Sequence, residues 1–408
     1  MKHLKTLSIA AVFGFLSQTA NASCAFENDI PVSLLSPGFA AWKAKADAMG
    51  ECGNFTPVLD QEYETKIAAA LDAQPSLYQI AGLTVSTFDT LSNRNLLRPL
   101  DDYIAKYAPN LPDRRKVKVD GKVYAIASMM NVQHLMYRSD VLADLGIEVP
   151  QTYEEVLAAA ETIQASGKVE YALGGTFKGG WNLGEEFVNM HLGFGGQLVD
   201  EEGNPTINND AGLATLEMLK RLTEYMDPEF LASDSTYVQQ QFQQGKIAIA
   251  NLWASRASAM FDENESTVAD SIVMAAAPSA VDGGTPATTL WWGGFGIAKN
   301  TDDASAEAAF RVAMEGSDAG MVTTPGNNDL NIWLIEGFQP NATSIGAIET
   351  IEKGTVPLYP ASPAVSLMHS ALGRGVSDFL IGEKSAAETL QAISEDYITS
   401  AQEAGLLK

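Results

Sequence analysis

Aromatic and amide side chains at predicted strand ends and loops are the residues of this sequence best suited to chemistry. Sugars present C–H patches on their ring faces and hydroxyls around the rim, so a sugar site needs flat aromatic faces and orienting polar groups. Candidates of this kind are Trp181, Asn182, Trp253, Trp292, Gly293 and Gly294. The two glycines leave the main chain open to the close approach of a ligand. Packing in the core is the alternative for each tryptophan, and we assign Trp42 and Trp291 to the core.

The elements that must position such groups alternate between strand and helix in the first part of the chain. Apolar runs at 31–35, 55–59 and 77–81 are each followed by a turn and a helical segment. This order favours a mainly parallel sheet with helices on both faces, where ligands bind beyond the carboxyl ends of the strands. The loops that follow these strands are therefore predicted to face a ligand, through Ser36, Glu62, Tyr63, Thr84 and Ser86.

Motifs for nucleotide, metal or nucleophilic chemistry are absent from the sequence. Each Gly-Lys pair is followed by Val or Ile rather than by Ser or Thr, which excludes a P-loop. His134, His191 and His369 have no metal-ligand spacing, and no Gly-x-Ser-x-Gly motif occurs. We expect a non-enzyme with no catalytic residue, no cofactor and no metal. The 51 acidic residues leave a carboxylate pair for glycoside hydrolysis open as an alternative.

The amino terminus and the charge indicate an exported protein that avoids nucleic acids. Lys2 and Lys5 precede an apolar run at 7–16 and the small residues at 20–22, which is the pattern of a cleaved signal peptide over residues 1–22. The net charge of −25 disfavours nucleic acid and anionic membranes, which attract basic patches. A chain of 408 residues exceeds the size of a single core, so two domains are expected.

The two cysteines, Cys24 and Cys52, lie close to the start of the mature chain. In an oxidising periplasm we expect them to form a disulfide, with two free thiols as the alternative. The bridge would connect the mature amino terminus to the end of the first helix.

The stretch from Tyr124 to Leu157 carries the most specific pattern. An alternating, strand-like run passes a polar interruption at Asn131, and a helix then ends at Gly146. A second helix starts after Pro150, with Thr152 and Glu155 in capping-box spacing. This order resembles the interlobe crossover of extracellular solute-binding proteins of carbohydrate-type ABC importers. The positions that fit the family pattern are Tyr124, Leu135, Tyr137, Asp140, Gly146, Ile147, Pro150 and Thr152. Ala127 and Arg138 replace the usual Pro and Asn.

The resemblance implies an α/β, two-lobe periplasmic binding protein of type II, with the ligand in the cleft between the lobes. Residues 23–131 and 277–328 would form lobe I, and residues 132–276 and 329–408 would form lobe II. It further implies ligand contacts by Asn131, Trp253 and the main chain around Gly293, and it places Arg374 near a family contact position. The implied partners are membrane permease subunits of an ABC importer, and we expect a monomer in the periplasm.

The function predicted from this resemblance is capture of a sugar, small oligosaccharide, glycoside or polyol for import. Members that bind maltodextrins have an aromatic residue near the position of His369, which suggests a smaller ligand here. Arg374, Lys178 or Arg256 would suit a charged glycoside. Two alternatives stay open, a binding protein for another solute such as a polyamine and a periplasmic glycoside-processing enzyme.

Overall fold

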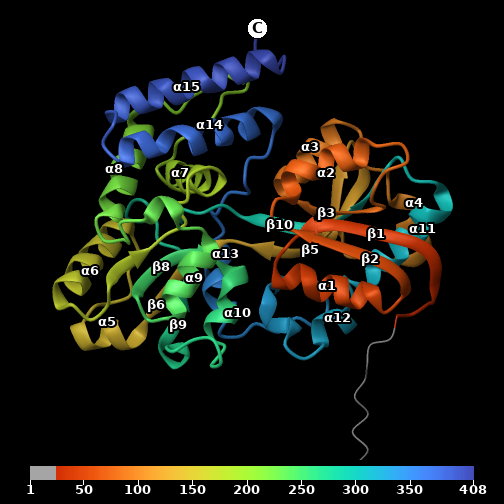
Figure 1. Cartoon of the computed structure of the whole chain (residues 1–408), viewed down its shortest axis with the longest axis horizontal. Coiled ribbons are helices and arrows are strands. Elements are labelled where there is room, and N and C mark those ends of the chain that lie inside the picture. Colours follow the sequence, from red (N-terminus) through yellow and green to blue (C-terminus); the bar gives the residue numbers. More distant parts are fainter. Residues whose placement is uncertain (1–23) are drawn as a thin grey trace, which may run out of the picture.

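The computed structural model describes residues 24–408, so the predicted signal peptide lies outside the described residues. Strands and helices form two α/β lobes side by side, each built around its own sheet (Figure 1). Among residues 24–408, no helix is long and apolar enough to cross a membrane. The predicted two-lobe α/β architecture is confirmed.

The sheet of the first lobe combines parallel strands with an antiparallel insertion. Within residues 24–408 its strand order is β11-β5-β10-β3-β1-β2, and β4 pairs with β5. Strands β1, β2 and β3 are parallel, whereas β10 runs antiparallel to both β3 and β5. The strands are β1 (Asn28–Pro37), β2 (Gly53–Asp60), β3 (Ile80–Thr84), β4 (Lys116–Val119), β5 (Lys122–Asn131), β10 (Trp291–Ile297) and β11 (Ile332–Trp333).

The sheet of the second lobe is smaller, with the order β7-β8-β6-β9 among the described residues. Strand β6 lies antiparallel between β8 and β9, and β7 is parallel to β8. These strands are β6 (Gln133–Arg138), β7 (Tyr171–Gly174), β8 (Ile247–Trp253) and β9 (Ile272–Ala275).

Helices cover both sheets, and their starts follow local sequence signals. Thr152 and Ser385 each accept a hydrogen bond from the third helical amide, and the glutamate at that position accepts the backbone amide of the capping residue. The capping box predicted at Thr152 is thereby confirmed, and Ser385 forms a second one. The first lobe carries α1 (Ala40–Gly50), α2 (Tyr63–Asp72), α3 (Val85–Asn93), α4 (Asp101–Tyr107), α11 (Asp303–Glu315) and α12 (Ala319–Thr323). The second carries α5 (Ser139–Leu145), α6 (Tyr153–Ser166), α7 (Trp181–Gly193), α8 (Asp210–Thr223), α9 (Ser235–Gln243), α10 (Ala257–Met260), α13 (Ile345–Glu352), α14 (Pro363–Leu380) and α15 (Ala386–Glu403).

The chain passes between the two sheets at three places. The first lies between the end of β5 at Asn131 and the start of β6 at Gln133. The predicted second crossing near Ala276 falls later, because residues 277–290 still pack on the second lobe, where the Tyr153 amide donates to Ser279 O at 2.9 Å. The predicted third crossing near Asn328 is also later, since β11 still pairs with β5.

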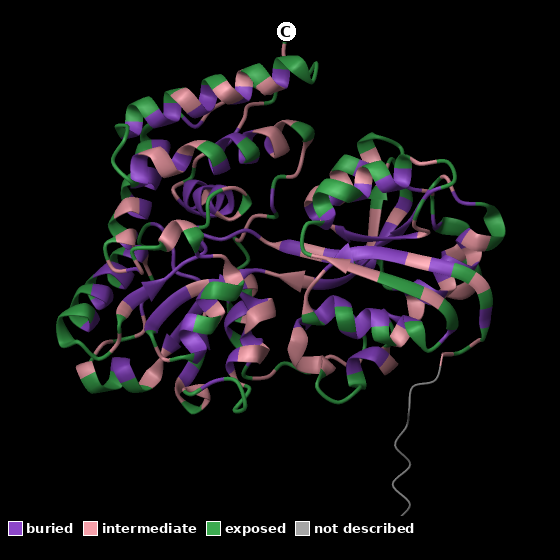
Figure 2. Cartoon of the chain, in the orientation of Figure 1, coloured by how far each residue is buried: buried purple, intermediate pink, exposed green. Residues whose placement is uncertain are grey.

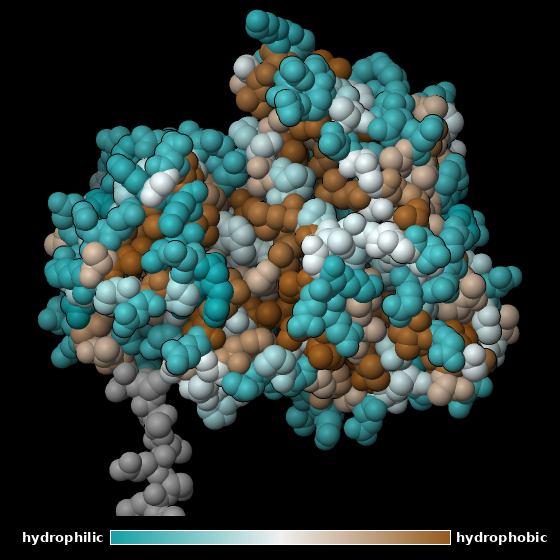
Figure 3. All heavy atoms as spheres, turned by 180° about the vertical axis from the view of Figure 1, so that it is seen from behind, coloured by the Kyte–Doolittle hydropathy of each residue, from teal (hydrophilic) through white to brown (hydrophobic). Residues whose placement is uncertain are grey.

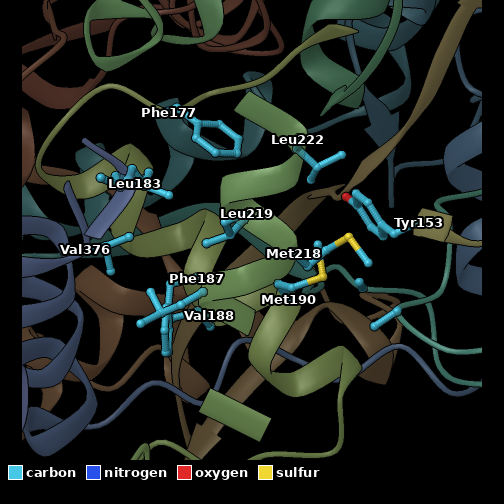
Figure 4. Close-up of a cluster of buried hydrophobic side chains, with 14 of the residues drawn as sticks. Tyr153, Phe177, Leu183, Phe187, Val188, Met190, Met218, Leu219, Leu222 and Val376 are labelled. Carbon is cyan, nitrogen blue, oxygen red and sulfur yellow. The ribbon is translucent and has the colours of Figure 1, made fainter. Parts of the chain in front are cut away.

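Each lobe has its own apolar core beneath its helices, and buried residues concentrate on the sheets and inner helix faces (Figure 2). In the second lobe, α7, α8 and α14 meet around a cluster that includes Phe187, Leu183, Leu219 and Val376 (Figure 4). In the first lobe, Cys24 and Cys52 are joined by a disulfide, as predicted. The bridge anchors the first described residue to the end of α1.

Candidate functional site

A cavity of about 170 Å³ lies between the lobes, and its walls come from both of them. Apolar side chains also gather along the junction of the lobes when the molecule is seen from behind (Figure 3). The first lobe contributes Phe39, Trp42, Glu64, Thr84, Met129, Asn131, Trp292, Gly293 and Asn331 to the lining. The second contributes Trp181, Ser235, Trp253, Ser255 and Arg256, while Trp291 enters from β10 at the junction. A ligand here would touch both lobes at once.

Three tryptophans form an aromatic wall on the side of the second lobe. Trp181 begins α7, Trp253 ends β8 and Trp291 begins β10. Their ring centroids lie 5.5 to 6.4 Å apart, with the Trp291 ring edge-on to the other two. Because Trp253 and Trp291 are almost fully buried while Trp181 is 39% exposed, the wall is fixed at its base and open at one end. Flat faces held in this way suit the C–H faces of a sugar or polyol.

A buried polar network holds this aromatic wall from behind. The Trp291 indole Nε1 donates to Glu185 Oε1 at 3.0 Å, and the Thr289 hydroxyl donates to the same oxygen at 2.7 Å. His369 stacks on Trp181 at 5.1 Å between ring centroids, and its Nε2 lies 2.8 Å from the Trp181 carbonyl oxygen. Burial raises the pKa of Glu185 to about 8 and lowers the pKa of His369 to about 4. Both groups are therefore largely neutral at pH 7.

The first lobe supplies a second aromatic surface, built on α1 and β10. Trp42 lines the cavity although it is fully buried from solvent, and the Lys45 ammonium lies 4.0 Å from its ring centroid. Lys45 Nζ donates to Ser128 Oγ at 2.7 Å, and Ser128 donates to Gly293 O at 3.2 Å. Burial, with a contribution from nearby Arg115, lowers the pKa of Lys45. This chain of contacts fixes the main chain of β10 where it meets the cavity.

Asn131 connects the two lobes at the first crossing. Its side-chain oxygen accepts the Ser255 amide at 3.2 Å, and its side-chain nitrogen donates to Ser255 Oγ at 3.3 Å. Asn131 closes β5 in the first sheet, whereas Ser255 follows β8 of the second. The pair therefore lies both at the first crossing between the sheets and in the cavity wall.

Two charged groups of opposite sign line the cavity from opposite lobes. Glu64 belongs to the first turn of α2, and Arg256 follows β8 in a short turn of 3₁₀ helix. Desolvation in the cleft raises the pKa of the Glu64 carboxyl, and a hydrogen bond from the Ser86 side chain offsets part of the shift. The remaining polar lining is neutral. The arrangement can bind and orient a small polar solute by stacking and hydrogen bonds.

Comparison with known proteins identifies this architecture. The sequence model of the bacterial extracellular solute-binding proteins matches residues 53–314, more than half of the chain. The chain belongs to this family. A probable ABC transporter-binding protein of Deinococcus radiodurans is 26% identical over 319 residues, covering 73% of each chain.

Solved structures of solute-binding proteins share the fold. A protein from Agrobacterium radiobacter K84 in complex with ribitol superposes with a TM-score of 0.76 at 20% identity, over 91% of this chain and 99% of that one. Maltose-bound MalE3 of T. maritima superposes with a TM-score of 0.74 at 18% identity, over 92% of this chain and all of the other. These likenesses establish the two-lobe fold of this solute-binding protein.

The structure brings six of the predicted ligand residues to the cavity wall. They are Thr84, Asn131, Trp181, Trp253, Trp292 and Gly293. They come from β3, β5, α7, β8 and β10. Contact between these residues and a ligand stays a prediction.

Three predicted residues of the first lobe lie behind the cavity wall instead. Tyr63 is buried, and its hydroxyl bonds Thr84 Oγ1 at 3.3 Å, so it supports a lining residue. Ser36 is fully buried within β1, where it packs against Gly82 of β3. The packing of the sheet requires glycine at position 294, since a Cβ there would lie 2.1 Å from Ile126 O.

Four further predicted residues also lie outside the cavity lining. Glu62 is exposed just before α2, and Ser86 bonds Thr84 Oγ1 at 3.0 Å within the first turn of α3. Asn182 is half-buried beside Trp181 in α7. Arg374 on α14 forms an ion pair with Asp396 on α15 at 2.7 Å.

Several lining residues were missed by the sequence analysis or assigned to the core. The sequence predicts that Trp42 and Trp291 pack in the core, yet both line the cavity while remaining buried. Glu64 lies two positions beyond the predicted Glu62, because α2 starts at Tyr63 and turns the next residue into the cleft. Ser255 lies two residues after Trp253, so the strand end predicted at Trp253 already indicated this loop. Phe39, Met129, Ser235 and Asn331 carried no recognisable signal.

Proposed function

We propose that this protein is the periplasmic substrate-binding component of an ABC importer that captures a sugar, small oligosaccharide, glycoside or polyol. The observation that carries the proposal is the interlobe cavity, where five tryptophans from both lobes surround hydrogen-bonding groups that are neutral apart from Glu64 and Arg256. Its volume lies below the ~300–1,000 Å³ typical of drug-sized ligands, which favours a small solute. The ribitol and maltose bound in the two related structures belong to the same chemical classes.

The mechanism follows from the position of the cavity between the lobes. A solute that touches only one lobe gains part of its contacts, whereas closure of the hinge brings the tryptophans of the second lobe and Trp42 of the first onto it together. The difference in affinity between the open and closed forms supplies the free energy of closure. The closed form would then be recognised by the membrane permease subunits of the importer. The protein would act as a monomer and without catalysis.

A screen by thermal shift tests the ligand class. Sugars, alditols, glycosides and polyamines are each added to the mature protein, and a ligand at 100 times its Kd should stabilise the fold by about 2.7 kcal/mol. Stabilisation by carbohydrates or polyols supports the proposal. If a polyamine stabilises the protein and no carbohydrate does, the proposal is wrong. Turnover of a stabilising glycoside, followed by chromatography, would favour an enzyme instead.

Replacement of Trp253 tests the site. Trp253→Ala removes a stacking surface, and we expect binding of the carbohydrate found in the screen to weaken by about tenfold or more. Trp253→Phe keeps a flat ring and should retain most of the affinity. Isothermal titration measures both variants, and the melting curve of the unliganded protein checks their folding. Unchanged affinity in a folded Trp253→Ala protein would show that Trp253 only packs.

A further inference from the structure

We propose that the natural ligand is an acidic sugar derivative, a uronate or aldonate, and that its carboxylate binds Arg256. The inference rests on the proposed function and names the chemical class within it. Arg256 lines the interlobe cavity in the turn that follows Trp253. A carboxylate attached to a sugar that stacks on Trp253 would therefore lie close to this guanidinium.

Arg256 is held in place by neutral partners. Its Nη2 donates to Ser235 Oγ at 2.8 Å and its Nη1 donates to Gln239 Oε1 at 3.5 Å. Among residues 24–408, no carboxylate oxygen lies within 4.0 Å of its nitrogens, unlike those of Arg98, Arg138, Arg221 and Arg374. A guanidinium has more N–H donors than these two bonds use, and its fork matches a carboxylate. The group is thus pre-oriented and keeps capacity for an anion.

Asp234, the acidic side chain whose charge acts on Arg256, is already hydrogen-bonded to other donors. Asp234 caps α9, where its Oδ1 accepts the amides of Thr236 and Tyr237, each at 3.0 Å. Its Oδ2 accepts Lys178 Nζ at 3.2 Å. Asp234 therefore acts on Arg256 only through space, and burial lowers the pKa of Arg256 with Asp234 partly offsetting the effect. The half-buried positive charge lacks the direct partner that such a charge normally has.

The other two cations that suit a charged ligand are already neutralised. Lys178 is paired with Asp234, and Arg374 is paired with Asp396 away from the cavity. One unpaired guanidinium balances one negative charge, which favours a carboxylate over a doubly charged phosphate. Arg256 in the wall also disfavours a polyamine, because like charges in a cleft repel each other.

Glu64 sets the orientation of the ligand in the cavity. It lines the cavity from the first lobe, whereas Arg256 lines it from the second. A sugar acid can place its carboxylate at Arg256 and present its hydroxyl groups to Glu64, because a carboxylate accepts hydrogen bonds from hydroxyls. The reverse orientation would bring two carboxylates together. The cleft then binds the anionic end of one small molecule at Arg256 and its hydroxyl-rich end at Glu64.

Isothermal titration with matched ligand pairs tests the proposal. The pairs are glucuronate with glucose, galacturonate with galactose, and gluconate with glucitol. For wild-type protein we expect at least one acid to bind about tenfold or more tightly than its neutral counterpart, the scale of a charge-assisted hydrogen bond. Arg256→Gln should reduce this preference to about threefold or less, measured as the ratio of the affinities of the same variant for the acid and for its neutral counterpart. Arg374→Gln is the matched control, and it should retain the full preference.

The outcomes separate this inference from the proposed function. If neutral sugars or alditols bind wild-type protein as tightly as every acid does, the inference is overturned and the proposed function stands. If no carbohydrate of either kind binds while a polyamine does, both fail. An acid preference that survives in Arg256→Gln would refute the role of Arg256. Should that variant not fold, Arg256→Lys keeps the charge without the fork and should give an intermediate preference.

Discussion

Removal of the Cys24–Cys52 disulfide should cost the first lobe a calculable part of its stability. The bridge joins residues 28 positions apart, and closing a loop of this length lowers the entropy of the unfolded chain by an amount equivalent to about 3–4 kcal/mol at 25 °C. Cys52 is also fully buried beside Met49 and Ala46 in the first-lobe core, so serine there adds a smaller packing cost. We therefore expect the double variant Cys24→Ser/Cys52→Ser to lose at least the loop contribution.

Equilibrium denaturation in guanidinium chloride measures this loss. Wild-type protein is compared with and without reductant, since reduction opens the bridge and leaves the side chains otherwise unchanged. Both the reduced protein and the double variant should unfold with a free energy about 3–4 kcal/mol lower in the transition of the first lobe. Neither cysteine lines the cavity, so affinity for the ligand should stay the same while the protein is folded. A loss below about 1 kcal/mol in both samples would refute the loop-entropy reasoning.

Two further substitutions test the buried network and the β10 strand. Burial raises the pKa of Glu185 from 4.5 to about 8, so the folded protein keeps a proton that the unfolded chain releases, and wild-type stability should fall between these pH values. Glu185→Gln should remove this part of the fall, and its advantage should vanish below pH 4.5; parallel stability curves for both proteins would contradict the assignment. Gly294→Ala should destabilise by about 1–3 kcal/mol, because its Cβ would lie 2.1 Å from Ile126 O. Gly179→Ala is the control, since no described atom lies within 4 Å of its added Cβ, and equal melting temperatures for the two variants would count against the clash.

Local patterns in the sequence predicted the parts of the fold that depend on neighbouring residues. The start of α6 could be predicted from Thr152 and Glu155, because these two capping residues are only three positions apart in the chain. The polar interruption at Asn131 predicted the end of β5, because the apolar run of the strand stops there. The next strand, β6, starts at Gln133 and belongs to the other sheet. Trp253 was found at the cavity because a strand end in such a sheet points to the cleft.

The rest of the site depends on contacts between distant segments. Ser235 and Arg256 meet only when α9 packs beside the end of β8, and no spacing in the sequence encodes that contact. Trp42 combines core and cavity wall in one side chain, so its helical spacing indicated the core alone. Glu64 was missed by a small error in helix phase, since one residue turns a helix by about 100°. The family resemblance could place Arg374 near the site, but only the structure shows its ion pair with Asp396.

Because of where its tryptophans lie, the intrinsic fluorescence of this protein should report whether the ligand site is occupied. The sequence contains six tryptophans, all within the described residues, and Trp333 of β11 is the one that does not line the cavity. Ultraviolet excitation at the red edge of protein absorption therefore samples almost solely the walls of the ligand site. A solute that displaces water from these rings should change the emission of nearly every fluorophore in the molecule. Titrations and stopped-flow measurements of solute capture can thus be made on the unlabelled protein, with Trp333→Phe removing the remaining background.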